Sequence, residues 1–327
     1  MKKDTLLYAA HSGIQKAVRR GNLDLAHTCF ELMWADKQHQ SWYKWRFPII
    51  VIEDAYYLVG EVADFLNKRT DDKKEWKRML YKVVLATKNK DSHALLSLAT
   101  ESIGNAVKGS ELALVRKLVD GMTEENIKQK AEDAYDYLME KREYTTYEQK
   151  AMQYLKARAS MGGMVWDRYS MLPTMVLIYK RGLDRDMILN QVDDDVEAYF
   201  LLNGDDARPE EIAMPWYVFD MHTRIGMATM SIYLKKHGTK MAITRPQLER
   251  LWFLKSSGFV PSTLVRYPKE GKKPTCITTA WWDKWLAIAC KFGKYDTTKK
   301  ADAVWRSIEH DVQGIIKWLL MKEDKED

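Results

Sequence analysis

The stretch WRFPIIVIEDAYYL, from Trp45 to Leu58, joins a β-branched apolar run to two adjacent carboxylates, Glu53 and Asp54. Apolar residues followed by paired acids are typical of the magnesium-binding strand of a P-loop ATPase. That strand works only beside a phosphate-binding loop of the form G-x-x-x-x-G-K-[ST]. Gly271 and Gly293 are the only glycines followed by Lys, and neither has the upstream glycine or the hydroxyl residue that the loop requires. The sequence therefore argues against an ATPase.

A helix explains the same stretch better. Pro48 suits a first helical turn, and Ile49, Ile52 and Tyr56 fall at i, i+3 and i+7, the spacing of one helical face. The two carboxylates then lie beside an apolar stripe. We expect them to pair with Arg46 or another basic neighbour, or to cap an adjacent helix.

The composition favours an all-α fold. Hydrophobic residues make up 46% of the 327 residues and charged residues 30%, whereas Gly (16) and Pro (8) are scarce. No apolar run is long enough to span a membrane, and the first residues turn polar too soon for a signal peptide. The three cysteines form no C-x-x-C pair, which indicates a reducing compartment. We expect a cytoplasmic protein without a membrane contact, a cofactor or a metal.

Apolar periodicity predicts a helical hairpin over the first forty residues, with a very short turn in which Asn22 caps the second helix. A polar break at SMGG, residues 160–163, divides the chain into expected domains at 1–162 and 163–327. Further helices are predicted at 73–89, 92–107, 110–121, 124–142, 147–160, 215–238, 245–257, 281–292 and 299–322.

The run AVRRGNLDLAHTCFELMWADKQ, followed by WYKWRFPIIVIEDAYYL, resembles the C-terminal helical region of clamp-loader-like AAA+ ATPases of the RarA/MgsA type. The likeness covers about residues 10–90. A shorter element, FDMHTRIG at 219–226, is similar to a D-x-H-T-x-x-G element of some proteins in this group. The residues that carry the two likenesses are Arg20, Gly21, Asn22, Ala26, Met33, Arg46, Ile49, Ile50, Glu53 and Asp54, and then Asp220, His222, Thr223 and Arg224.

The resemblance implies a multi-helix array like the clamp-loader collar. In the family this region drives homo-oligomerisation, as a tetramer, and works around replication forks and single-stranded DNA. The sequence departs from the family because it lacks the nucleotide loop and the arginine finger. ATP hydrolysis is therefore not implied, although a separate replication ATPase is an expected partner.

Within FDMHTRIG, a metal or acid-base site is not expected. If the element is helical, Asp220 and His222 point about 200° apart and cannot converge on one ion. Arg224, four residues after Asp220, is the expected ion-pair partner. The acidic run VDDDVEAYF at 192–200 lacks the spacing of an EF-hand, and we expect a solvated helix start there.

The C-terminal part is strongly basic, with sixteen Lys and Arg against five acids in residues 235–306. Cations bind phosphates and aromatic faces stack on unpaired bases, a combination found in single-strand binders. Trp282 and Trp285 are expected in the core, and the loop RYPKEGKK either contacts nucleic acid or is a solvated face. The candidate nucleic-acid-binding residues are Arg266, Lys269, Lys272, Lys273, Lys284, Lys291 and Lys294.

The sequence thus predicts a non-catalytic, oligomeric helical protein of DNA replication or recombination that binds single- or double-stranded DNA. Neither G-x-S-x-G nor H-E-x-x-H is present. One alternative is a protein-interaction factor that modulates a replication ATPase. Another is a metal-dependent nuclease that uses Glu53 and Asp54 with the acids at 193–195.

Overall fold

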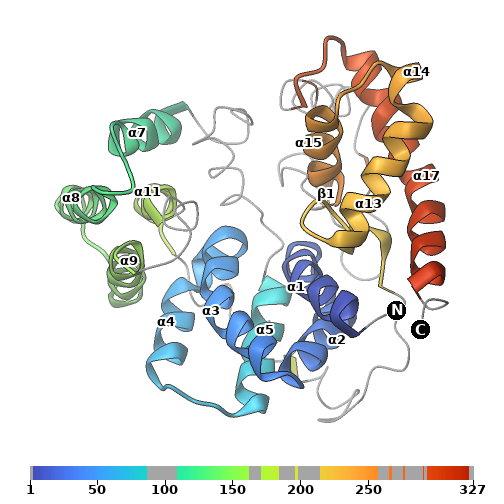
Figure 1. Cartoon of the computed structure of the whole chain (residues 1–327). Coiled ribbons are helices and arrows are strands. Elements are labelled where there is room, and N and C mark those ends of the chain that lie inside the picture. The colour runs from blue at the N-terminus through green and yellow to red at the C-terminus, as the bar shows by residue number, and fades with distance from the viewer. Residues whose placement is uncertain are drawn as a thin grey trace. The chain divides into compact units, whose positions relative to one another are not determined.

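The protein is an all-helical array (Figure 1), as predicted. The computed structural model describes residues 3–86, 109–161, 171–183, 196–197, 214–256, 265–266, 275–276, 290 and 293–323. Two-residue strands β1 (Val265–Arg266) and β2 (Thr275–Cys276) pair antiparallel, with Val265 opposite Cys276, where the sequence predicts a loop or short hairpin. The predicted helix at 92–107 and all but one residue of 281–292 lie outside the described residues.

The chain forms two compact units. Unit 1 comprises Met1–Tyr43 and Arg208–Asp327, and unit 2 comprises Lys44–Ala207. This division differs from the boundary expected at residues 162 and 163. The reason is that the N-terminal hairpin packs with elements from the C-terminal part of the chain, a pairing that no local composition change reveals.

Unit 1 begins with the predicted hairpin of α1 (Lys3–Arg20) and α2 (Leu23–Trp34). Gly21 forms the turn with a φ of +63°, a conformation that other residues adopt at a cost. The Asn22 side chain accepts a hydrogen bond from the Leu25 amide at 3.0 Å and so caps α2. The hairpin prediction and its cap are confirmed.

The rest of unit 1 comes from the second half of the chain: η2 (Trp216–Val218), α13 (Arg224–Tyr233), η3 (Leu234–Gly238), α14 (Thr239–Met241), α15 (Arg245–Ser256) and α17 (Thr298–Glu323). α17 packs against α13 and α15, and η2 packs against α1. The single helix predicted for 215–238 is wrong. Pro215 is extended, η2 is a single 3-10 turn, and α13 begins only after Thr223 caps it.

Unit 2 holds the second part of α3 (Lys37–Asp54), followed by η1 (Tyr56–Leu58), α4 (Val59–Asn67), α5 (Lys73–Ala86), α7 (Gly109–Val119), α8 (Ile127–Met139), α9 (Thr146–Ala159) and α11 (Met171–Arg181). α9 packs against α4, α8 and α11. Buried Glu148 ties this group together: its carboxylate accepts hydrogen bonds from Arg142 Nη2 (2.7 Å), the Leu183 amide (3.1 Å) and the Thr145 amide (2.9 Å).

The stretch from Trp45 to Leu58 is helical up to Asp54, as predicted. α3 starts at Lys37, so Pro48 lies inside the helix and not in its first turn. Arg46 forms the expected ion pair with Glu53, with Nη2 and Oε1 3.6 Å apart. Asp54 is buried at the end of α3. Glu53 and Asp54 therefore lie at the end of a helix in unit 2, and not at the end of a strand.

Candidate functional site

The D-x-H-T-x-x-G element forms a tight loop that leads into α13. The Thr223 hydroxyl donates to the Asp220 carbonyl and accepts from the Gly226 amide, both at 3.0 Å, which makes Thr223 the N-cap of α13. Gly226 passes so close to the loop that a Cβ at this position would lie 1.8 Å from the Asp220 carbonyl oxygen. Local packing therefore requires both the Thr and the Gly of this spacing.

Lys16 of α1 holds the carboxylate of this loop. Its Nζ lies 2.5 Å from Asp220 Oδ2 and 2.5 Å from the Ser12 hydroxyl, and the two charged side chains are only 2% and 3% exposed. The contact joins residues 204 positions apart in the sequence. Removing two charges from water is costly, and close pairing with further hydrogen bonds offsets this cost.

Burial and pairing act against each other on this pair. Burial lowers the pKa of Lys16 to about 8, although the attraction of Asp220 opposes the decrease. Burial would raise the pKa of Asp220, but the Lys16 ammonium and the hydrogen bond from His222 outweigh it and hold this pKa below its usual value. Near pH 7 both groups are therefore charged.

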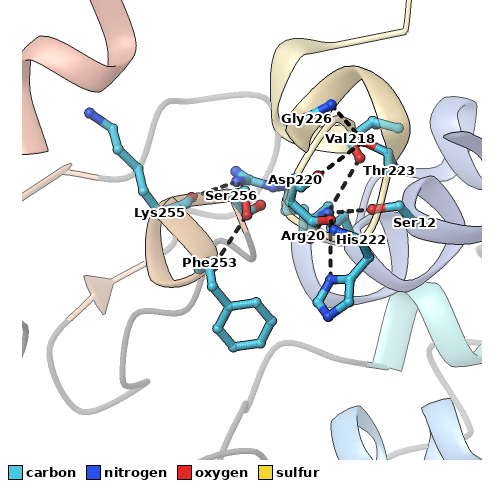
Figure 2. Close-up of polar contacts among 11 residues, drawn as sticks. Ser12, Arg20, Val218, Asp220, His222, Thr223, Gly226, Phe253, Lys255 and Ser256 are labelled. Atoms are coloured by element: carbon cyan, nitrogen blue, oxygen red, sulfur yellow. Dashed lines mark hydrogen bonds and ion pairs between the residues drawn. The ribbon is translucent and has the colours of Figure 1, made fainter. Parts of the chain in front are cut away.

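Asp220 also orients His222 (Figure 2). Asp220 Oδ1 accepts from the His222 backbone amide at 2.9 Å and lies 3.2 Å from Nδ1 of the ring. Because the carboxylate is ionised and can only accept, Nδ1 donates to it. The imidazole is 61% exposed. The loop thus presents an oriented histidine at the surface of unit 1.

Arg20 joins the same region to the end of α15. Its Nη2 donates to the carbonyls of Ser256 at 2.9 Å and Lys255 at 3.3 Å, as Figure 2 shows. These carbonyls belong to the last helical turn, whose acceptors have no partner within the helix. The guanidinium also lies 3.9 Å from the centre of the Tyr217 ring. Arg20 is therefore a structural clamp between α1, α15 and the segment that carries η2.

The structure corrects one predicted contact and adds a residue that the sequence analysis missed. Asp220 and His222 do converge, because the loop is not helical, and the partner of Asp220 is Lys16, not Arg224. Arg224 is exposed in the first turn of α13. Ser12 and Gly13, which precede Lys16 on α1, are the sequence feature that could have revealed its burial. Small residues on a helix indicate that another segment packs closely against it.

A second polar cluster in unit 1 lies where α1 meets the start of α3. His39 Nδ1 and His11 Nε2 are 2.7 Å apart, and the His11 ring stacks on Trp42 with centroids 3.6 Å apart. Tyr8 contacts both histidines edge-on. Burial, with the nearby His39 second, lowers the pKa of His11 to about 4. Sequence analysis did not single out this cluster.

Among the predicted nucleic-acid-binding residues, Lys294 is placed and exposed, and its carbonyl accepts from Gln247 Nε2 at 2.7 Å. Arg266 lies in β1. Lys269, Lys272, Lys273, Lys284 and Lys291, like Trp282, Trp285 and most of the acidic run at 192–200, lie outside the described residues.

The described helices around Lys294 are basic. Residues 224–256 and 293–317 contain twelve Lys and Arg against five Asp and Glu. Four of the five acids already have cationic partners: Glu249 with Arg245, Asp296 with Lys300, Asp302 with Arg306, and Asp311 with Lys236 and His237. Within the described part of the chain, the exposed side chains of Lys235, Lys240, Lys294 and Lys299 have no acidic partner. This surface carries unneutralised positive charge.

Two absences among the described residues bear on other classes of site. No group of three or more His, Cys, Asp or Glu in this part of the chain is arranged to hold a metal ion. None of the described helices combines the length and the apolar composition that a membrane span needs.

Comparisons with known proteins give no match, whether to family models, to curated proteins or to solved structures. The resemblance to the collar of clamp-loader-like ATPases therefore stays a prediction, and a function must be argued from the geometry.

Proposed function

We propose that the protein is a non-catalytic, nucleic-acid-binding helical scaffold of DNA replication or recombination. The observation that supports this most is the unneutralised charge of unit 1 on α14, on the start of α17, and on Lys294, whose carbonyl accepts from Gln247 of α15. Lys240, Lys294 and Lys299 supply exposed ammonium groups there. We name this surface the basic end.

The mechanism is electrostatic and tolerant of sequence. Each phosphate that a Lys or Arg neutralises releases a counterion, so that affinity falls steeply as salt rises. The predicted basic loop lies between α15 and α17 in the sequence and supplies four more cations, Arg266, Lys269, Lys272 and Lys273. Assembly of several copies, as the resemblance implies, multiplies weak contacts through effective concentration.

The test is fluorescence anisotropy of labelled DNA with the full chain, titrated at several salt concentrations. The double variant Lys240→Glu/Lys294→Glu reverses two charges at the basic end. We expect it to weaken binding by roughly tenfold or more and to reduce the slope of log affinity against log salt by about 2. Light scattering on the same samples measures the oligomer.

The matched control reverses two exposed lysines of unit 2, Lys68→Glu/Lys128→Glu, and changes the net charge by the same amount. If the control weakens binding as much as the basic-end variant, the attraction is a property of net charge and the proposed surface is wrong. If the wild-type chain binds neither single- nor double-stranded DNA at low salt, the nucleic-acid function is wrong. The protein-interaction alternative then remains.

A further inference from the structure

One face of α17 carries exposed cations in phase. Lys299, Arg306 and Lys317 are exposed. At 3.6 residues per turn they project within about 20° of one another, and at 1.5 Å per residue the outer two are about 27 Å apart. Arg306 is held by Asp302, whereas the structure pairs neither Lys299 nor Lys317 with an acid among the described residues.

The C-terminal end of α17 also exposes an aromatic ring. Trp318 is 48% exposed and Met321 is 52% exposed, and at 3.6 residues per turn they project about 100° and about 40° to one side of the cation row. Lys322 Nζ lies 4.2 Å from the centre of the Trp318 ring. A large aromatic ring exposed to water beside two lysines has no role in the core of unit 1.

Gly314 lies one turn before Trp318 on the same flank. A Cβ at this position would meet nothing within 4 Å, so no neighbour requires a glycine here. Glycine inside a helix costs roughly 0.5–1 kcal/mol relative to alanine. The missing side chain leaves the helix backbone at Gly314 open to a ligand.

We infer that this face of α17, from Lys299 to Lys322, binds a single strand of nucleic acid, with phosphates along the cation row and a base stacked on Trp318. The inference rests on the proposed function and names its ligand. Stacking needs an unpaired base, because the base faces in a duplex are covered by neighbouring pairs. A second copy of the chain is a poorer occupant, since two such rows placed face to face repel.

The geometry also sets a length. At the rise of a stacked strand, about 3.4 Å per nucleotide, the distance from Lys299 to Lys317 corresponds to roughly eight nucleotides. Shorter strands can contact Trp318 and Lys317 but cannot reach Lys299 at the same time. Affinity should therefore increase with strand length up to this span, and then level off.

The experiment measures anisotropy of labelled oligothymidines of roughly four, eight and twelve nucleotides, and of a duplex of the longest length. The full wild-type chain is compared with Trp318→Ala, Trp318→Phe and Met321→Ala. Trp318→Ala should weaken binding of the longest single strand by roughly tenfold, while Trp318→Phe retains most of the affinity. Met321→Ala, which removes a similarly exposed side chain from the same face, should stay within about twofold of the wild type.

Three outcomes overturn the inference while the proposed function stands. In the first, Trp318→Ala and Met321→Ala bind the long strand equally well. In the second, Trp318→Ala weakens the duplex as much as the single strand. In the third, light scattering shows that Trp318→Ala dissociates an oligomer, which makes this face an interface between copies. Failure of the proposed function looks different, because the wild-type chain then binds no DNA at all.

Discussion

The buried pair of Lys16 and Asp220 should be strongly coupled in stability. In Asp220→Asn the Lys16 side chain stays only 2% exposed, but its ammonium group loses its counterion. It then faces a neutral amide in place of a carboxylate. Removing one partner of a buried ion pair typically costs about 3–5 kcal/mol. The destabilisation cannot exceed the cost of deprotonating Lys16 in the folded state. For a lysine with an ordinary pKa, this cost is about 5 kcal/mol at pH 7.

Lys16→Met should cost a similar amount, because Asp220 then lacks its counterion. The double variant leaves no buried charge to compensate, and replacing such a pair by neutral groups is often nearly neutral. We therefore expect the double variant to be more stable than the sum of the two single changes predicts, with an interaction energy of about 3 kcal/mol or more. The free energy of unfolding is measured by urea denaturation. Hydrogen exchange at the backbone amides of α1 reports the local stability of unit 1.

The control cycle uses Arg245 and Glu249, a partly exposed i, i+4 pair on α15 at 2.7 Å. Its interaction energy should be about 0.5 kcal/mol or less. If the cycle of Lys16 and Asp220 gives a value as small as that of the control, the ion pair does not hold α1 to the loop before α13, and the account of this site is wrong.

Two further predictions concern glycines and pH. Gly226→Ala should strongly destabilise unit 1, because its Cβ would collide with the Asp220 carbonyl. Gly314→Ala, with open space around it, should stabilise the protein by about 0.5–1 kcal/mol. Equal melting temperatures for the two variants would contradict this prediction. The folded-state pKa of His11, about 4, lies below its unfolded value of 6.5, so its stabilisation is complete above pH 6.5 and declines as pH falls toward 4. After allowance for solvent screening the loss is about 1–2 kcal/mol, and His11→Gln should flatten the pH dependence of the urea midpoint in this range.

Local chemistry made the N-terminal hairpin predictable. Gly21 and Asn22 supply the left-handed turn and the cap, and the apolar periodicity on either side fixes which faces meet. The ion pair of Arg46 and Glu53 was predictable for the same reason, since both residues lie on one helix. The all-α class followed from a composition poor in glycine and proline.

Contacts between distant segments were not predictable from one sequence. In the sequence, nothing distinguishes Lys16 from an ordinary surface lysine. Its partner Asp220 lies 204 positions away, and only the structure shows that the two are in contact. The helical interpretation of 215–238 failed because apolar periodicity continues through a segment whose backbone is set by the hydrogen bonds of Thr223 and Asp220. A side chain that competes with the helix for backbone groups ends the regular pattern without changing the hydropathy.

The D-x-H-T-x-x-G spacing resembles a functional motif, yet folding accounts for most of it. Asp220 is the counterion of Lys16, Thr223 caps α13, and Gly226 allows the close approach. His222 is different, because it is oriented by the loop and exposed, and the cap and the close approach do not involve its side chain. The same distinction applies to Trp318, exposed at the end of the cation row. Function should therefore be sought at side chains that the fold positions but does not need.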